Sequence, residues 1–181
     1  MGTYYDIDAI MTDAQKVPCT FTLTVPGLGY MEGSPGQPIH SGTSVALPIW
    51  LAEILAVSQS LGTAPMATID MPLCLQPRVL NALKADPRTV DLRQQAAHFY
   101  SLGARMLELF EEDDLVDVLL QTFKQRAAII SDHASNARGA LSDAKGVDFM
   151  RGLDEQERCL FRIAHDSGNA TRAWMVDVKK T

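Results

Sequence analysis

The sequence predicts a mainly α-helical protein with a small β-containing domain at its N-terminus. Apolar residues alternate with threonines over 19–25, which is the two-residue period of a half-buried strand. After Pro48, apolar residues instead recur at steps of three and four, which is typical of amphipathic helices. The change near residue 47 predicts two domains, a small β-containing domain over 1–47 and a helical domain over 48–181.

The N-terminal domain is predicted to contain one helical turn and two strands. Residues 6–11 begin with acidic side chains, which suits the start of a helix. The strand over 19–25 ends at a Pro-Gly pair. A long turn-rich loop is predicted over 26–44, with Gly and Pro concentrated at 33–36, and it leads into a second strand over 43–47. A piece this small does not bury enough apolar surface to fold well alone. We therefore expect it to pack on the rest of the chain or on a partner.

The helical domain begins with two shorter predicted helices. The first starts at Pro48, close to the first helical position, where the missing N–H group costs little, and continues to Gly62. Residues 71–75 are apolar and predicted to be extended. A second short helix begins at Pro77 and ends at Asp86, which precedes another proline.

Two long amphipathic helices follow, separated by the acidic run 111–114. The first is predicted roughly over 92–110, with one apolar stripe. The second is predicted roughly over 115–141, about 40 Å long at 1.5 Å per residue. It carries apolar residues on two faces, and a chain this short has few other helices to cover both. We therefore expect a partner subunit on one face.

A final helix is predicted to start near Leu153 or Asp154. It carries Leu160 and Phe161 on an apolar face. Gly168 and the asparagine after it are expected to weaken the helix before Trp174 is reached.

Composition excludes several classes of protein. The net charge of −6 argues against a protein that chiefly grips nucleic-acid phosphates, so any DNA contact is expected to be weak or indirect. Three widely spaced cysteines without a CxxC pair predict neither a disulfide framework nor a zinc site. No apolar run approaches the roughly 20 residues that span a bilayer, so no membrane association is predicted.

A search for catalytic chemistry leaves two weak candidates. The segment 42–46 is close to a nucleophile elbow around Ser44, but that motif needs a helix directly after the serine, and an apolar run leading to Pro48 follows instead. His165 and Asp166 are adjacent, yet neighbouring helical residues point in different directions. His98 abuts an apolar stripe and is interpreted as packed and hydrogen-bonded.

The charged runs are interpreted as solvent-exposed. This applies to the acidic run 111–114 and to the acidic residues of 154–157, whose negative charge also suits the first turn of a helix. Basic residues are dispersed, among them Lys124 and Arg126, and they form no strong patch. Arg158 and Arg162 could share one helix face, but they lie beside several acids.

Several stretches, in order along nearly the whole chain, resemble the third partner subunit of the GINS complex of eukaryotic DNA replication, and fungal members most. Together they are specific to that family. They are the entry strand with its Pro-Gly-Leu-Gly turn, the Leu-Pro-Ile-Trp-Leu-Ala helix start, the central segment with its following aromatic pair, the start of the long helix and the last helix: 18–29, 47–52, 86–100, 119–123 and 153–161.

The resemblance implies a fold and a function. The fold is a small β-containing domain before a larger helical domain, the reverse of the order in two of the other three GINS subunits. The function is that of a non-catalytic scaffold in a four-subunit complex, without ATPase site, cofactor or metal. That complex joins the minichromosome-maintenance hexamer and the Cdc-forty-five protein in the replicative helicase, which places the chain in the nucleus.

We expect a set of apolar and aromatic residues to form the interface with sister subunits or the core that supports it. Periodicity alone leaves open how they divide between those roles. The alternatives are a small hydrolase that uses Ser44 or a histidine–acid pair, and a helical adaptor unrelated to replication. The predicted interface or supporting-core residues are Trp50, Leu51, Phe99, Tyr100, Leu119 and Phe123.

Overall fold

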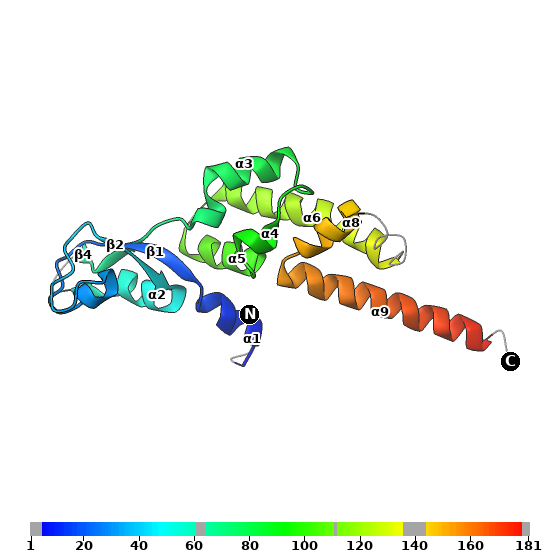
Figure 1. Cartoon of the computed structure of the whole chain (residues 1–181), viewed down its shortest axis with the longest axis horizontal. Helices are drawn as coiled ribbons and strands as arrows, with labels where there is room; N and C mark the ends of the chain where they lie inside the picture. The colour runs from blue at the N-terminus through cyan, green and yellow to red at the C-terminus, as the bar shows by residue number, and fades with distance from the viewer. Residues whose placement is uncertain (1–4, 61–63, 111, 136–143, 179–181) are drawn as a thin grey trace. The chain divides into compact units, whose positions relative to one another are not determined.

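The computed structural model describes residues 5–60, 64–110, 112–135 and 144–178 of the chain (Figure 1). They form two compact units, Met1–Leu73 and Cys74–Thr181. Helices dominate and the strands are confined to the first unit, which confirms the predicted fold class. The division falls after Leu73, later than the predicted boundary after residue 47, because one helix and one further strand pack with the N-terminal strands.

The first unit is built on a three-stranded antiparallel sheet. Its central strand, β1 (Lys16–Phe21), pairs with β2 (Ser44–Pro48) on one side and β5 (Ala67–Ile69) on the other. Val17, Cys19 and Phe21 are buried and alternate with more exposed residues, as the two-residue period requires. The strand therefore begins three residues before the predicted one and ends at Phe21, because its ladder with β2 extends back to Lys16.

Helices cover this sheet and precede it. In α2 (Ile49–Val57), which starts directly after β2 and contacts all three strands, Ile49 and Ala52 are buried. It ends at Val57, before the predicted stop at Gly62, which lies outside the described residues. The other elements of the unit are α1 (Ile7–Asp13), the 3-10 helix η1 (Gly29–Glu32) and a short ribbon of β3 (Gln59–Ser60) and β4 (Ala64–Pro65).

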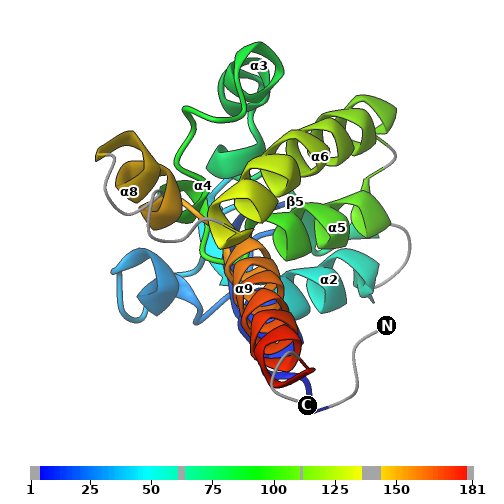
Figure 2. The same cartoon turned by 90° about the vertical axis from the view of Figure 1, so that its right-hand side faces the viewer.

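The second unit is helical, and α6 (Asp113–Ser135) is its central element. It contacts α3 (Pro77–Ala85), α5 (Phe99–Leu109) and α9 (Glu155–Val178). In Figure 2, α3 lies above α6, and α5 and α9 lie below it. A Cβ atom on Gly103 would lie 2.6 Å from a methyl carbon of Leu119, so this glycine allows α5 and α6 to approach closely. The smaller elements are η2 (Leu73–Leu75) at the division, α4 (Leu92–Gln95) and α8 (Ala144–Arg151).

The helix predicted over 92–110 is interrupted in the structure. Ala96 adopts an extended conformation between α4 and α5. The carbonyl group of Ala97 accepts a hydrogen bond from the backbone N–H of Glu155 at 3.1 Å, and the backbone N–H of Tyr100 donates to Asp154. The break supplies partners for the start of α9, which lies far away in sequence. Residue periodicity could not reveal it.

Other predictions differ in their boundaries. Residues 71–75 are not all extended, because Leu73–Leu75 forms η2. The end of the helix predicted to reach residue 141 falls partly on 136–143, outside the described residues, and α8 was not predicted. The last helix runs unbroken through Gly168 to Val178, so the expected weakening does not interrupt it. None of the helices described is long and apolar enough to span a bilayer.

Candidate functional site

Four of the six predicted packing residues meet where α5 contacts α6. The Tyr100 ring is edge-on to Phe99, with ring centroids 5.7 Å apart, and to Phe123, at 5.3 Å. Phe99, Tyr100 and Leu119 are buried, whereas Phe123 is half-buried. In the single chain these residues are therefore mostly core, and Phe123 reaches the surface.

The other two predicted residues lie in the first unit on α2. Trp50 is half exposed, and Leu51 is half-buried. The exposed apolar residues of α2 lie at steps of four and three along the helix, since Ile54 and Val57 follow Trp50. A stripe of this kind on a monomeric domain is typical of an interaction surface.

The second unit is held together by a buried arginine. Arg126 on α6 is 1% exposed. Its guanidinium donates two hydrogen bonds, of 2.7 and 2.9 Å, to the fully buried carboxylate of Glu157 on α9. The remaining N–H groups donate to the carbonyl oxygens of Pro87 (2.8 Å), Val90 (3.1 Å) and Gly152 (3.3 Å). All five donors of the guanidinium are therefore used, and one side chain connects three segments distant in sequence.

The start of α9 completes this network. Asp154 and Glu157 are three residues apart and form a capping box, in which the Asp154 N–H donates to Glu157 Oε2 at 3.2 Å. The Asp154 carboxylate accepts hydrogen bonds from the backbone N–H groups of Glu155 and Tyr100. The Tyr100 hydroxyl donates to Glu157 Oε1 at 2.9 Å. Glu157 is thus satisfied from α5, α6 and its own helix.

Burial sets the protonation of these groups. Desolvation raises the pKa of Asp154 to about 6, against the hydrogen bonds from Tyr100 and Glu155, which lower it. Burial, followed by the charge of Glu157, also raises the pKa of Tyr100, which keeps its hydroxyl protonated and able to donate. The network is consistent with a structural role, because each of these polar groups is occupied by a partner within the unit.

The interpretation of 154–157 as a solvent-exposed acidic run was therefore wrong for Asp154 and Glu157, which are both fully buried. It was also wrong to treat Arg126 only as a dispersed surface charge. The sequence held a signal for each: Asp154 and Glu157 have capping-box spacing, and Arg126 lies among the stripe residues of α6, between Thr122 and Ile130. The other acidic run, in its described part 112–114, is exposed as predicted, and Glu111 lies outside the described residues.

The candidate nucleophile Ser44 does not lie in a nucleophile elbow. It is the first residue of β2, and the strand continues after it, whereas the motif needs a helix at that point.

Burial raises the pKa of Cys19 and of Cys74 to about 11, which keeps both thiols protonated and poorly nucleophilic.

The histidines differ from expectation in detail. His98 is buried as predicted, but its Nδ1 atom has no hydrogen-bond partner within the described residues. His165 Nδ1 lies 3.5 Å from Asp166, closer than expected for adjacent helical residues, and its ring stacks on Phe161. Asp166 is largely exposed on the helix surface. No group of three metal-binding side chains is found in the part of the chain that the structure describes.

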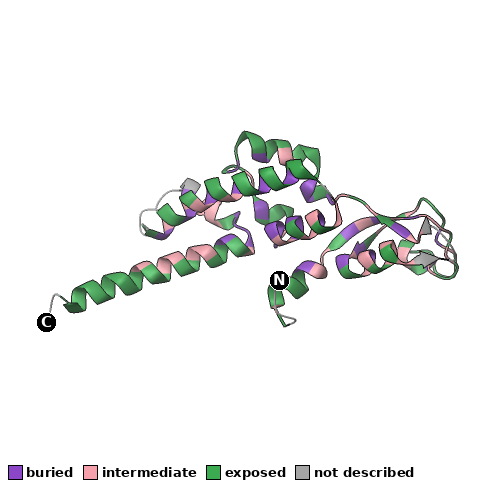
Figure 3. Ribbon diagram, turned by 180° about the vertical axis from the view of Figure 1, so that it is seen from behind, coloured by how far each residue is buried: buried purple, intermediate pink, exposed green. Residues whose placement is uncertain are grey.

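The C-terminal half of α9 carries several exposed apolar residues. Every residue from 169 to 178 is exposed, and Figure 3 shows this end of the helix in the colour of exposed residues. Trp174, Met175, Val176 and Val178 are among them, each more than half exposed. Exposed apolar side chains grouped on one helix make this half of α9 a candidate interaction surface.

Comparisons with known proteins match both units. Residues 5–57 match the family described as the PSF3 N-terminal domain, and residues 74–176 match the GINS complex protein helical bundle domain. A DNA replication complex GINS protein PSF3 from Phaeosphaeria nodorum is 63% identical over 99% of both chains. The chain belongs to the PSF3 family of GINS proteins.

More distant PSF3 proteins match over similar lengths. The protein from Aspergillus fumigatus is 59% identical over 98% of this chain and 99% of its own. That from Saccharomyces cerevisiae is 34% identical over 95% and 97%. The resemblance inferred from the ordered sequence blocks is confirmed. The helical bundle match contains the Arg126 network and almost all of α9, and the PSF3 N-terminal match contains the α2 stripe.

Proposed function

We propose that this PSF3-family chain is a non-catalytic scaffold subunit of a four-subunit GINS complex that acts in DNA replication. The observation that carries the proposal is the exposed apolar half of α9, residues 169–178. Exposed apolar residues that extend beyond the packed part of a unit favour association with another chain. Its relatives are named as replication complex GINS proteins, which supports sister GINS subunits as the partners.

The mechanism is stoichiometric binding. On α9, Ile163, Ala170, Trp174 and Val178 are separated by seven, four and four residues, so they form one stripe along the helix. The stripe presents its apolar side chains to a sister subunit, while the Arg126 network holds the N-terminal end of α9 against α6. The α2 stripe that begins at Trp50 provides a second contact surface.

The complex in turn joins the minichromosome-maintenance hexamer and the Cdc-forty-five protein in the replicative helicase, in the nucleus. This part of the proposal rests on the family alone. The acidic chain contributes scaffolding and no strong contact with DNA, consistent with a net charge of −6. The alternatives are a hydrolase that uses Ser44 or a histidine–acid pair, and an adaptor outside replication. The hydrolase is disfavoured because β2 continues after Ser44 and because Asp166, beside His165, is largely exposed.

The test is co-expression of the chain with the three sister subunits, read by native mass spectrometry. The expected product is a 1:1:1:1 complex. The double variant Trp174→Asp with Val178→Asp is expected to lower the yield of complex at least tenfold. Ala173→Asp places one such charge on an exposed position of α9 away from the stripe and is expected to leave the yield unchanged. A stable monomer without affinity for the sister subunits would contradict the proposal.

The role in replication is tested in cells. Depletion of the chain is expected to stop DNA synthesis, and the unaltered chain is expected to restore it. A Ser44→Ala chain should restore it equally well, since Ser44 has no part in the proposed mechanism. Continued DNA synthesis after depletion would favour the adaptor outside replication.

A further inference from the structure

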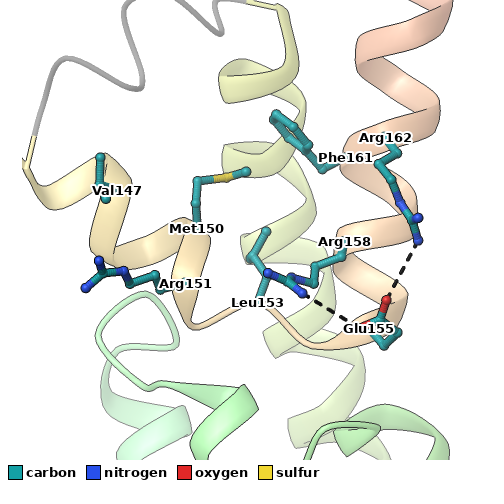
Figure 4. Close-up of a pocket in the computed structure, with 8 residues that line it drawn as sticks. All are labelled: Val147, Met150, Arg151, Leu153, Glu155, Arg158, Phe161 and Arg162. Atoms are coloured by element: carbon teal, nitrogen blue, oxygen red, sulfur yellow. Dashed lines mark ion pairs between the residues drawn. The ribbon is translucent and has the colours of Figure 1, made fainter.

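A cavity of about 440 Å³ lies between α8 and the first turns of α9 (Figure 4). Its apolar lining consists of Val147 and Met150 from α8, Leu153 from the connection and Phe161 from α9. In Figure 4, the Met150 and Phe161 side chains point toward one another across the cavity. The volume lies within the range of roughly 300–1,000 Å³ that is common for ligand sites.

The charged lining of this cavity is unbalanced. Arg151, Arg158 and Arg162 contribute three positive charges, whereas Glu155 is the one acidic residue among the described lining residues. Glu155 is shared further, because Arg93 also pairs with it at 3.3 Å. One carboxylate therefore serves several guanidinium groups, and an excess of positive charge remains on a chain whose net charge is negative.

The existing ion pairs in the cavity are weak enough to be exchanged. Arg158 lies 4.0 Å from Glu155 and Arg162 lies 3.7 Å from it, and Figure 4 shows both reaching toward this carboxylate. The side chains are 43% and 66% exposed, and exposed pairs of this kind contribute at most about 1 kcal/mol. An incoming carboxylate can take either guanidinium at little cost, with the two-pronged geometry that arginine favours.

Arg158 and Arg162 of the cavity lie on a different face of α9 from the apolar stripe. With about 100° per residue along a helix, Arg162 lies about 100° and Arg158 about 140° around the axis from Ile163, the first residue of that stripe. A sister subunit that covers the stripe of the proposed function leaves the arginine face available. The apolar lining favours a peptide side chain over a bare phosphate as the ligand.

We propose that this cavity binds a short acidic peptide segment with a bulky apolar side chain, supplied by a protein outside the four-subunit complex. The apolar side chain fills the space between Met150 and Phe161. Flanking carboxylates pair with Arg158 and Arg162. The site goes beyond the scaffold role, because it recruits a further partner to the assembled complex.

The test measures binding of a fluorescein-labelled peptide, Asp-Glu-Asp-Phe-Leu-Asp-Glu, to the assembled complex by fluorescence anisotropy. Binding is expected to weaken at least tenfold in the double variant Arg158→Gln with Arg162→Gln. Arg172→Gln removes an arginine of α9 that is also exposed but lies outside the cavity, and it should leave the affinity unchanged. Replacing the acids of the peptide by amides, or its Phe and Leu by Ala, should also abolish binding.

Several results would overturn the proposal. These are absent binding to the unaltered complex, equal binding to the Arg158→Gln/Arg162→Gln variant, and binding to the separate chain but not to the complex. The last result would mean that a sister subunit occupies the cavity, as would failure of the arginine variant to assemble. Failure of the unaltered chain to assemble would instead contradict the scaffold role. In that case the cavity is tested by peptide binding to the full chain alone, and absent binding there would overturn the proposal.

Discussion

Arg126 on α6 and Glu157 on α9 form a buried, two-pronged ion pair, with Nε–Oε1 and Nη2–Oε2 distances of 2.7 and 2.9 Å. Both side chains are at most 1% exposed. Buried charges are costly unless they are paired and hydrogen-bonded. The pair therefore holds the first turn of α9 against α6, while the far half of the helix remains exposed.

Replacing Arg126 by Ala is expected to lower the free energy of unfolding by about 3–5 kcal/mol, because Glu157 is left as an unpaired buried charge. The measurement is the urea midpoint of the assembled complex at one fixed protein concentration. Arg93→Ala is the control, since its pair with Glu155 is partly exposed and should contribute less than about 1 kcal/mol. Equal losses for the two variants would contradict this assignment.

The double variant Arg126→Met with Glu157→Met tests whether the pair alone matters. Removing both charges abolishes the unpaired carboxylate, yet the carbonyl oxygens of Pro87 and Val90 still lose their donor. We expect only partial recovery relative to Arg126→Ala in the same urea measurement. Full recovery would show that the carbonyl contacts contribute nothing.

Asp154 should make the stability of the chain depend on pH. Burial raises its pKa from 3.8 to about 6 on folding, so between these values the unfolded chain loses the proton first. Asp154 therefore reduces stability as pH rises from about 4 to 6, by up to about 3 kcal/mol, and its effect is constant at higher pH.

Asp154→Asn removes this titration but keeps one oxygen that can cap α9. The difference in unfolding free energy, variant minus unaltered chain, is expected to shift in favour of the variant between pH 4 and 6. Loss of the second acceptor oxygen adds a cost that is independent of pH. The informative quantity is therefore the slope, and a difference that stays flat across this interval would contradict the raised pKa.

Two glycines should respond oppositely to replacement by alanine. A Cβ atom at Gly29 would lie 2.3 Å from the backbone oxygen of Gln37 and 2.4 Å from that of Ser34, so Gly29→Ala is expected to destabilise the first unit. In α9, the nearest atom to a Cβ at Gly168 is a side-chain nitrogen at 3.5 Å. Gly168→Ala should stabilise the helix by about 0.5–1 kcal/mol. Thermal denaturation distinguishes the signs.

Neighbouring residues of α2 separate core from predicted interface. Ile49 is fully buried and Trp50 is half exposed. Ile49→Ala is expected to lower the unfolding free energy by about 2–5 kcal/mol. Trp50→Ala should change it by less than about 1 kcal/mol but weaken binding to the sister subunits, measured as complex yield at limiting concentration. The reverse pattern would place Trp50 in the core.

Much of the fold could be predicted where local physical chemistry decides the structure. The alternation over 19–25 predicted a strand in this region. The strand observed, β1, runs from Lys16 to Phe21, so it begins three residues and ends four residues earlier than predicted. Pro77 was predicted to open a helix, and α3 begins there. The ordered sequence blocks also identified the family, because residue identities along the chain can be compared without knowing which residues touch.

Only the tertiary structure decided the features that depend on distant partners. At the break around Ala96, the carbonyl oxygen of Ala97 accepts a hydrogen bond from the backbone N–H of Glu155 at the start of α9. Arg126 and Glu157 are buried because α6 and α9 cover each other, whereas sequence composition suggests that such charges face water. The sequence by itself thus determined the helical class and the PSF3 family. Local spacing marks Asp154, Glu157 and Arg126 as unusual charged residues, but only long-range packing decides that they meet in one buried network and that the far half of α9 stays exposed.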